Sequence, residues 1–338
     1  MNSDNYKDNI DKNNIRKANE ALKDMPAFIK DYFDFKGKSV STKTLLGYAY
    51  DTQGFIKWIF GDKDISNLTI EDISKINTEN IEGYIKYLQN DSVKNNLSIT
   101  INRKISALNS MFKYLVNTKQ LLYNPCELID FLNYKPKQKN LLTKDEINIF
   151  LNTIKCNNRN ISQRQNSYLD ITKNRNYTIA LLLITTGIRI NECVGLNIES
   201  VNLTDRTIIV RRETNIKLIL CDKTAKTLDE YIKMRKKIKT ESDALFLSLQ
   251  NKRICTQAIE DMLKKYSVIC NMNNLITPKI FRNTFLDIII KNSKDFDFAN
   301  SYLGIGKISD IKIMMNKLNK EEKTYIKNTL NASFSFIA

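Results

Sequence analysis

Residues 186–196 read TGIRINECVGL, and this stretch decides the fold. An apolar segment, which we predict to be a helix from Ile179 to Thr185, precedes it. Gly187 permits a turn after that helix, because glycine lacks the Cβ atom that restricts other residues. A second apolar helix is expected after the turn, with Glu192 three residues beyond Arg189. The stretch therefore predicts two helices that meet at a turn carrying an arginine.

A second arginine segment lies at residues 275–285, LITPKIFRNTF, where Arg282 follows Pro278. Between the two segments, residues 207–211 (TIIVR) and 217–220 (KLIL) are predicted to be strands joined by a short turn. Further helices are expected over about 225–239, 256–270, 280–292 and 310–329. The second half of the chain is thus expected to be helical with one small β-hairpin.

The first part of the chain shows helical spacing of its apolar residues. In one stripe the steps alternate between four and three residues, through Ile101, Ile105, Leu108, Phe112 and Leu115. Three more stripes fall within residues 28–33, 45–59 and 81–88. This pattern predicts a compact unit of four helices.

Composition changes suggest the boundaries. We expect a mobile N-terminal segment over 1–24, a helical domain over 25–130 and a polar, basic linker over 131–141. A second domain over 142–330 opens with Thr143 and Glu146, whose spacing is that of a capping box. An apolar tail over 331–338 ends the chain.

The charge balance restricts the partners without deciding among them. The 53 Lys and Arg residues exceed the 37 Asp and Glu residues, giving a formal charge of +16. Such a surplus indicates a polyanion such as nucleic acid, or a merely solvated basic surface. The chain has no histidine, and its six cysteines form no CxxC pair, so we expect no metal site. The polar N-terminus and the short apolar runs predict a soluble cytoplasmic protein without a signal peptide or membrane span.

The two arginine segments, the hairpin between them and the helical unit before them resemble the tyrosine recombinases, or phage integrases. Leu303-Gly304 resembles a Leu-Gly step in that family, and the resemblance covers roughly residues 25–316. It implies a mainly α fold with a small antiparallel β-sheet. The expected parts are a helical, SAM-like core-binding domain and an α+β catalytic-type domain. It also implies double-stranded DNA as the partner and no cofactor.

The chemistry of that family explains the two arginines. A tyrosine attacks a DNA phosphodiester without a metal, and fixed cations stabilise the charge that builds on the phosphoryl oxygens. Arg189 and Arg282 match the two arginines that do this. Glu192 is expected to orient Arg189 rather than to react.

The rest of the family pattern is broken. The lysine of the hairpin, a general acid, falls on or beside Glu213, with Arg212 and Lys217 as the nearest cations. Lys279 replaces the histidine before the second arginine. Lys279 and Lys217 are tentative catalytic residues in place of the missing lysine and histidine. The residue after the Leu-Gly step is Ile305, and Met314 stands where the nucleophilic tyrosine is expected.

Another tyrosine could serve as the nucleophile. Tyr325 is the best placed, although a helix tyrosine packed on its own domain is the simpler interpretation. Tyr302 and Tyr266 have the spacing of core residues. The site therefore predicts either lost cleavage or a displaced nucleophile.

Contacts to DNA are expected from both domains. The candidates are Lys43, Arg103, Lys104 and Arg212. In resembling proteins the C-terminal tail docks on a neighbouring protomer, which implies a homo-oligomer on DNA. Alternatively, the tail folds back on its own core.

Three functions stay open. The first is a DNA-binding member of the family, acting in site-specific recombination or in DNA processing by a plasmid or other mobile element, with cleavage lost or reduced. The second is an active, atypical strand transferase, an integrase or a plasmid-transfer relaxase that uses a displaced tyrosine. The third is a basic helical module that binds RNA or another protein. Two arginines that converge on one phosphate would argue against the third.

Overall fold

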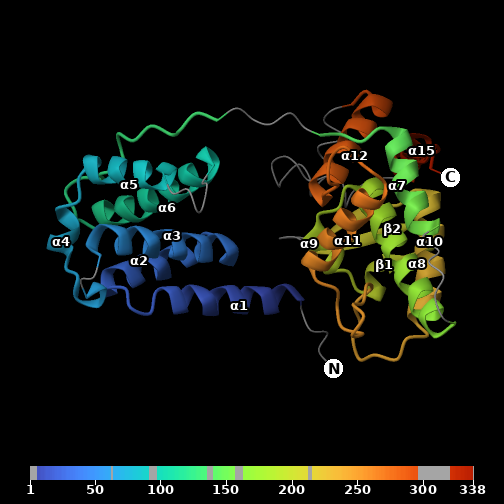
Figure 1. Ribbon diagram of the computed structural model, residues 1–338, viewed down its shortest axis with the longest axis horizontal. Helices are drawn as coiled ribbons and strands as arrows, with labels where there is room; N and C mark the ends of the chain where they lie inside the picture. The colour runs from blue at the N-terminus through green and yellow to red at the C-terminus, as the bar shows by residue number, and fades with distance from the viewer. Residues whose placement is uncertain are drawn as a thin grey trace. The chain divides into compact units, whose positions relative to one another are not determined.

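The structure is a computed structural model that describes residues 6–61, 64–90, 97–134, 140–156, 163–211, 215–295 and 320–337, with only the backbone described over 163–171. It divides into unit 1, Met1–Lys137, and unit 2, Gln138–Ala338. Figure 1 shows unit 1 as helices alone and unit 2 as helices with a small sheet. The division falls inside the stretch 131–141 that the sequence suggests as a linker.

Unit 1 is a helical bundle around one core. Its helices are α1 (Tyr6–Ala21), α2 (Ala27–Gly37), α3 (Thr42–Phe60), η1 (Ile65–Asn67), α4 (Ile70–Ser74), α5 (Thr78–Asn90) and α6 (Ser98–Asn117). All five residues of the stripe in α6 are buried, and helices α2, α3 and α5 cover them. The four predicted helices are therefore confirmed, and their apolar stripes form the core.

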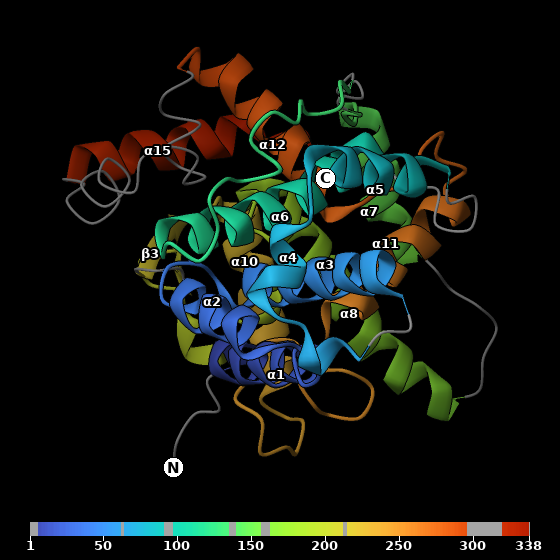
Figure 2. The ribbon, with the colours of Figure 1, turned by 90° about the vertical axis from the view of Figure 1, so that its left-hand side faces the viewer.

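The structure places a helix, α1, over most of the stretch 1–24 that the sequence predicts to be mobile. Helix α1 runs alongside α3 in both ribbon views (Figures 1 and 2). Ala18 and Ala21 are buried, and Gln53 of α3 donates a hydrogen bond of 2.9 Å to the Ala21 carbonyl. The small side chains of Ala18 and Ala21 allow this end of α1 to pack on the rest of the unit. This packing stabilises a helix whose own sequence is polar.

Unit 2 combines helices with one antiparallel sheet. Its elements are α7 (Lys144–Cys156), α8 (Gln163–Thr186), α9 (Ile190–Val194), η2 (Ile198–Ser200), β1 (Val201–Asn202), β2 (Thr207–Arg211), β3 (Asn215–Ile219), α10 (Asp222–Arg235), α11 (Thr256–Ile269), α12 (Pro278–Ser293) and α15 (Lys320–Ser333). The sheet order is β1-β2-β3, and Ile209 faces Lys217 in the β2–β3 pair. The predicted fold class, mainly α with a small antiparallel sheet, is confirmed. None of the described helices is both long and apolar enough to cross a membrane.

The start of unit 2 follows its sequence signal. The Thr143 backbone N–H donates to the Glu146 carboxylate at 2.8 Å, and the Glu146 N–H donates to the Thr143 hydroxyl at 3.2 Å. These two bonds satisfy donors that the first turn of α7 would otherwise leave unpaired. The predicted capping box is therefore confirmed.

The C-terminal tail packs on its own unit. Phe334 and Ile337 are buried, and the Phe334 ring stacks on Phe285 of α12 at 5.9 Å between centroids. The Asn148 side chain of α7 donates a hydrogen bond of 3.0 Å to the Phe336 carbonyl. Residues 331–333 belong to α15, so the tail is shorter than the predicted 331–338. In this single chain the tail thus folds back on its own core.

Replacing Phe334 by alanine is expected to destabilise unit 2 by about 3–5 kcal/mol, because a buried ring leaves a cavity that the core fills only in part. Trp58 is the single tryptophan and lies in unit 1. Its fluorescence therefore reports the unfolding of unit 1, and far-ultraviolet circular dichroism reports both units. We expect Phe334→Ala to lower the urea midpoint only in the circular dichroism. Ser335→Ala, an exposed neighbour, is the control. An unchanged midpoint would show that the tail is not docked.

Candidate functional site

The first arginine segment forms a tight turn between two helices. Helix α8 ends at Thr186, and Gly187 follows with a φ of +60°, in the left-handed region that favours glycine. The Gly187 N–H donates to the Leu183 carbonyl at 3.1 Å. Arg189 is then the N-cap residue of α9. The turn ends one helix and begins the next, and its two-helix arrangement is as predicted.

Glu192 holds Arg189 in place. Its carboxylate accepts a hydrogen bond of 2.9 Å from the Arg189 backbone N–H and another of 2.9 Å from the Arg189 Nη1. The Glu192 side chain is almost fully buried, whereas the Arg189 side chain is half-exposed. A guanidinium group has five N–H donors. The carboxylate therefore fixes one side of the fork and leaves the exposed side directed to solvent.

The second arginine segment comes to the same turn. Thr277 caps α12, and Pro278 occupies the first turn, where its missing N–H costs nothing. Arg282, one turn further along α12, donates through Nη1 to the Gly187 carbonyl at 2.5 Å. Gly187 lies only two residues from Arg189. The structure thus brings together two segments that are 95 residues apart in the sequence.

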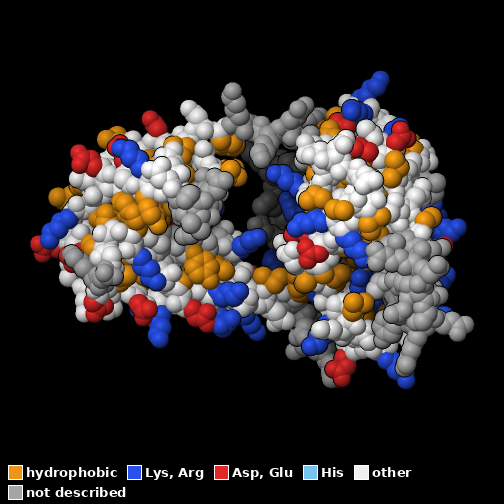
Figure 3. Space-filling model, in the orientation of Figure 1, with side chains coloured by type: hydrophobic (Ala, Val, Ile, Leu, Met, Phe, Trp, Pro, Cys, Tyr) orange, Lys and Arg blue, Asp and Glu red, His pale blue; other side chains and the backbone are white. Residues whose placement is uncertain are grey.

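Lys279 and Lys217 lie on the elements that the sequence indicates. Lys279 is exposed, one turn before Arg282 on α12. Lys217 is half-buried on β3. Figure 3 shows Lys and Arg side chains gathered on the edge of unit 2 along which α9 and α12 lie in Figure 1. The surface around the two arginines is therefore basic.

Of the three candidate nucleophiles, Tyr325 and Tyr266 lie within the described residues. Tyr325 lies on α15, which packs against α12 and β3, and 53% of its surface is exposed. Tyr266 is buried on α11 with its ring edge against Phe150. Arg212, Glu213, Tyr302, Ile305 and Met314 lie outside the described residues. Roles for any of these residues stay predictions.

Cys193 is the thiol nearest to the site in sequence. Burial, with a further contribution from the Glu192 charge, raises the pKa of this thiol far above its ordinary value. A protonated thiol is a poor nucleophile and a poor metal ligand. Among the described residues, no group of three or more Cys, Asp or Glu side chains is placed to hold a metal.

Sequence reasoning missed Arg253, which fastens the far end of α9. Its Nη1 donates to the carbonyls of Val194 and Leu196 at 2.9 and 3.0 Å. Its Nη2 donates to the Asn197 side-chain oxygen at 2.6 Å. These bonds fix the helix whose first turn carries Arg189 and Glu192. No local pattern marks Arg253, because these three partners are 56 to 59 residues away in the sequence.

Arg253→Ala is expected to destabilise unit 2 by about 2–4 kcal/mol, because two partly buried carbonyls lose their donor. Far-ultraviolet circular dichroism during urea unfolding measures the change, with Trp58 fluorescence again reporting unit 1. Lys252→Ala, the exposed neighbour, should leave the midpoint unchanged. An equally small effect of both substitutions would show that Arg253 does not fasten α9.

In unit 1, two of the predicted DNA contacts share one acid. Arg103 Nη2 and Lys104 Nζ approach Asp51 Oδ1 to 3.0 and 3.2 Å, and Arg103 Nη1 also bonds Oδ2. The Asp51 side chain is only 3% exposed, compared with 50% for Arg103 and 20% for Lys104. Lys104 is therefore committed mainly to Asp51. Arg103 and the exposed Lys43 of α3 face solvent.

The comparisons with known proteins agree with this geometry. The family model "Phage integrase family" matches residues 140–321, and "Phage integrase, N-terminal SAM-like domain" matches residues 29–119. The chain is 26% identical to the tyrosine recombinase XerS of Streptococcus agalactiae, over 91% of this chain and 97% of that protein. It is 27% identical to XerD of Staphylococcus epidermidis, over 84% and 92%.

Solved structures share the fold at lower identity. The Tn1549 transposon integrase in complex with circular intermediate DNA has a TM-score of 0.63 and 17% identity, covering 88% of this chain and 97% of that one. XerH bound to its difH substrate has a TM-score of 0.60 and 17% identity, covering 82% and 78%. The resemblance first suggested by the two arginine segments is confirmed, and the chain belongs to the phage integrase family.

Proposed function

We propose that this protein binds duplex DNA and acts in site-specific DNA recombination, with Arg189 and Arg282 on one phosphodiester group. The observation that carries the proposal is the bond from Arg282 to the Gly187 carbonyl, in the turn that presents Arg189. Guanidinium groups of two arginines that reach one turn would suit a phosphate, whose oxygens each accept hydrogen bonds. Relatives bound to DNA and the surplus of positive charge support the same partner.

The test compares duplex DNA, single-stranded DNA and duplex RNA as ligands of the full chain at one salt concentration. We expect the duplex DNA to bind tightest. Arg189→Ala and Arg282→Ala should each weaken duplex binding only modestly, because one phosphate contact is a small part of the total. Stronger binding of RNA or of single strands would overturn the proposal in favour of a different binding module.

An active enzyme with a displaced nucleophile is the second candidate. The observation that supports it is the exposure of Tyr325, since a half-exposed tyrosine side chain is accessible to a DNA strand. Cleavage by this route would also need a proton donor for the leaving 5′-oxygen, for which Lys217 and Lys279 are the candidates. The covalent adduct treated in the Discussion separates the two candidates.

Assembly of several copies on DNA through the C-terminal tail belongs to the same proposal. The tail would first have to leave its own core, where Phe334 and Ile337 are buried. An adjacent copy can offer the same apolar surface, so the exchange is nearly balanced in energy. The mass of the complex on a duplex with two binding sites tests it. Phe334→Ala should then weaken assembly as well as folding.

A further inference from the structure

Unit 1 carries a surface hollow that has no part in the contacts described above. It has a volume of about 520 Å³ and lies between the N-terminal half of α6 and the segment Phe131–Tyr134 that follows the bundle. Its walls include Ile99 and Arg103 from the helix and two aromatic rings from the segment. The hollow is shallow and largely open to solvent, so a ligand would lie against its walls rather than inside it.

The segment is fixed to α6 by one side chain. Asn102 donates to the Leu132 carbonyl at 2.9 Å and accepts from the Leu132 N–H at 2.9 Å. Leu132 also packs against the core of the unit. This stretch opens the linker that the sequence predicts over 131–141, yet residues up to Tyr134 are held on the helix. The backbone beside the hollow is therefore ordered by contacts of its own.

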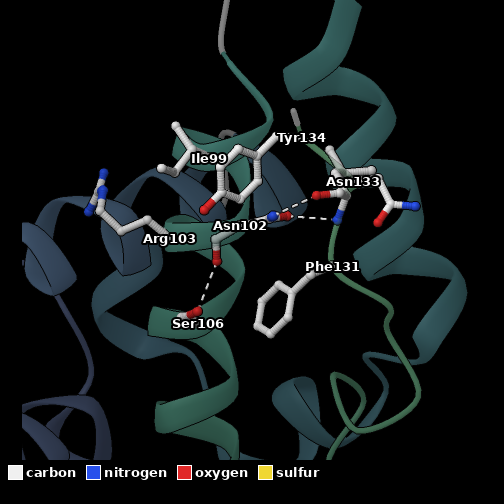
Figure 4. A pocket seen from close by; sticks show the side chains of 8 residues that line it. Ile99, Asn102, Arg103, Ser106, Phe131, Asn133 and Tyr134 are labelled. Atoms are coloured by element: carbon white, nitrogen blue, oxygen red, sulfur yellow. Dashed lines mark hydrogen bonds between the residues drawn. The ribbon is translucent and has the colours of Figure 1, made fainter. Parts of the chain in front are cut away.

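Two aromatic rings flank this fixed point and remain open to solvent. Phe131 and Tyr134 are each 55% exposed, and Ile99 is exposed to a similar degree. Figure 4 shows Tyr134 beside Ile99 and Phe131 on the Ser106 side of Asn102. Exposed rings held on an ordered backbone form a stacking platform for flat ligands.

Arg103 lines the same hollow, and it shares its carboxylate partner with a second cation, Lys104. Arg103 and Lys104 share the single carboxylate of Asp51, so two cations meet one anion. A Cβ atom at Gly47 would lie 3.3 Å from Arg103 Nη1, so the glycine leaves room for the guanidinium over α3. Arg103 is half-exposed and lines the hollow. This charge suits one further anionic group, such as a phosphate.

We propose that this hollow binds one unstacked nucleotide of a DNA strand, with the base against Phe131 and Tyr134 and its phosphate at Arg103. The inference rests on the proposed function, because it presumes that DNA reaches this surface. Stacking accounts for the rings, since every base has a flat face whatever its sequence. The half-exposed Arg103 accounts for one phosphate.

The experiment measures binding of the full chain to three duplexes of otherwise equal sequence. One is fully paired, one carries a single extrahelical 2-aminopurine, and one carries an abasic unit at the same place. We expect the extrahelical base to bind about 5- to 100-fold tighter than the abasic unit, as stacking on a protein ring predicts. The 2-aminopurine fluorescence should fall on binding, because stacking quenches it.

The double variant Phe131→Ala with Tyr134→Ala should remove this difference and leave binding to the paired duplex within about twofold. Both side chains are half-exposed, so the variant is expected to fold, which circular dichroism checks. Phe35→Ala, a similarly exposed ring on α2 outside the hollow, is the matched control and should keep the difference.

Two results would overturn the inference while leaving the proposed function intact. One is equal binding of the three duplexes by the unmodified chain. The other is a preference for the extrahelical base that persists in the double variant, which would place the base elsewhere. Failure to bind any duplex would instead contradict the proposed function itself. The experiment thus distinguishes failure of the nucleotide site from failure of DNA binding.

Discussion

Raising the salt concentration from about 50 to 200 mM is expected to lower the affinity of the chain for duplex DNA by about 10³–10⁵-fold. A protein that contacts about 6–10 phosphates releases that many condensed counterions, and salt opposes their release. The formal charge of +16 supplies enough cations for such a contact surface. Filter binding or fluorescence anisotropy across the salt range gives the slope of log affinity against log salt.

Single substitutions show how much each residue contributes to the slope of log affinity against log salt. Lys43→Ala is expected to lower its magnitude by about one unit, because Lys43 is exposed and would contribute one phosphate contact. Lys104→Ala should change it less, since Lys104 is mostly buried against Asp51. A flat salt dependence of the unmodified chain would contradict contact with many phosphates and favour a partner other than DNA.

Local patterns predicted most of the secondary structure. The apolar stripe of α6 and the Thr143–Glu146 capping box depend on residues within a turn or two of each other. The turn at Gly187 depends on one residue with a positive φ. Such features are visible in the sequence because each depends only on residues of the same helix or turn. The β2–β3 hairpin was predictable for the same reason, whereas the two residues of β1 were too few to form a pattern.

Features that depend on distant residues were not predictable in this way. Asp51 is a polar residue within an apolar helix stripe, and only the fold reveals that it faces Arg103, 52 residues later. Asn102 and Arg253 likewise bond backbone groups far along the chain. Helix α1 is polar in sequence, and its stability comes from packing on α3. Long-range partners leave no periodic signal, so structure was needed to find them.

Incubation of the unmodified chain with a nicked duplex is expected to give no covalent protein–DNA adduct. We propose that the two arginines hold a phosphate, whereas the resemblance leaves three chemical roles without their usual residues. By that resemblance, Met314 stands where the nucleophile is expected, Ile305 where a hydrogen-bonding partner is expected, and Glu213 on or beside the place of the general acid. Loss of a positioned acid or base costs about 10²–10⁴-fold in rate, and loss of the nucleophile removes covalent catalysis outright.

Met314→Tyr therefore should yield at most weak cleavage, because the leaving 5′-oxygen still lacks a positioned proton donor unless Lys217 or Lys279 reaches it. Denaturing gel electrophoresis of labelled DNA detects the adduct in every case.

If the unmodified chain does form a covalent adduct, Tyr325→Phe should abolish it and leave duplex binding unchanged, since Tyr325 is half-exposed. An adduct that survives this change would direct attention to Tyr302, because Tyr266 is buried against Phe150 and would have to leave the core to reach a phosphate. Arg282→Ala is the matched control for any adduct: it removes a phosphate contact but no tyrosine, so it should suppress covalent attack through Tyr325 and Tyr302 alike.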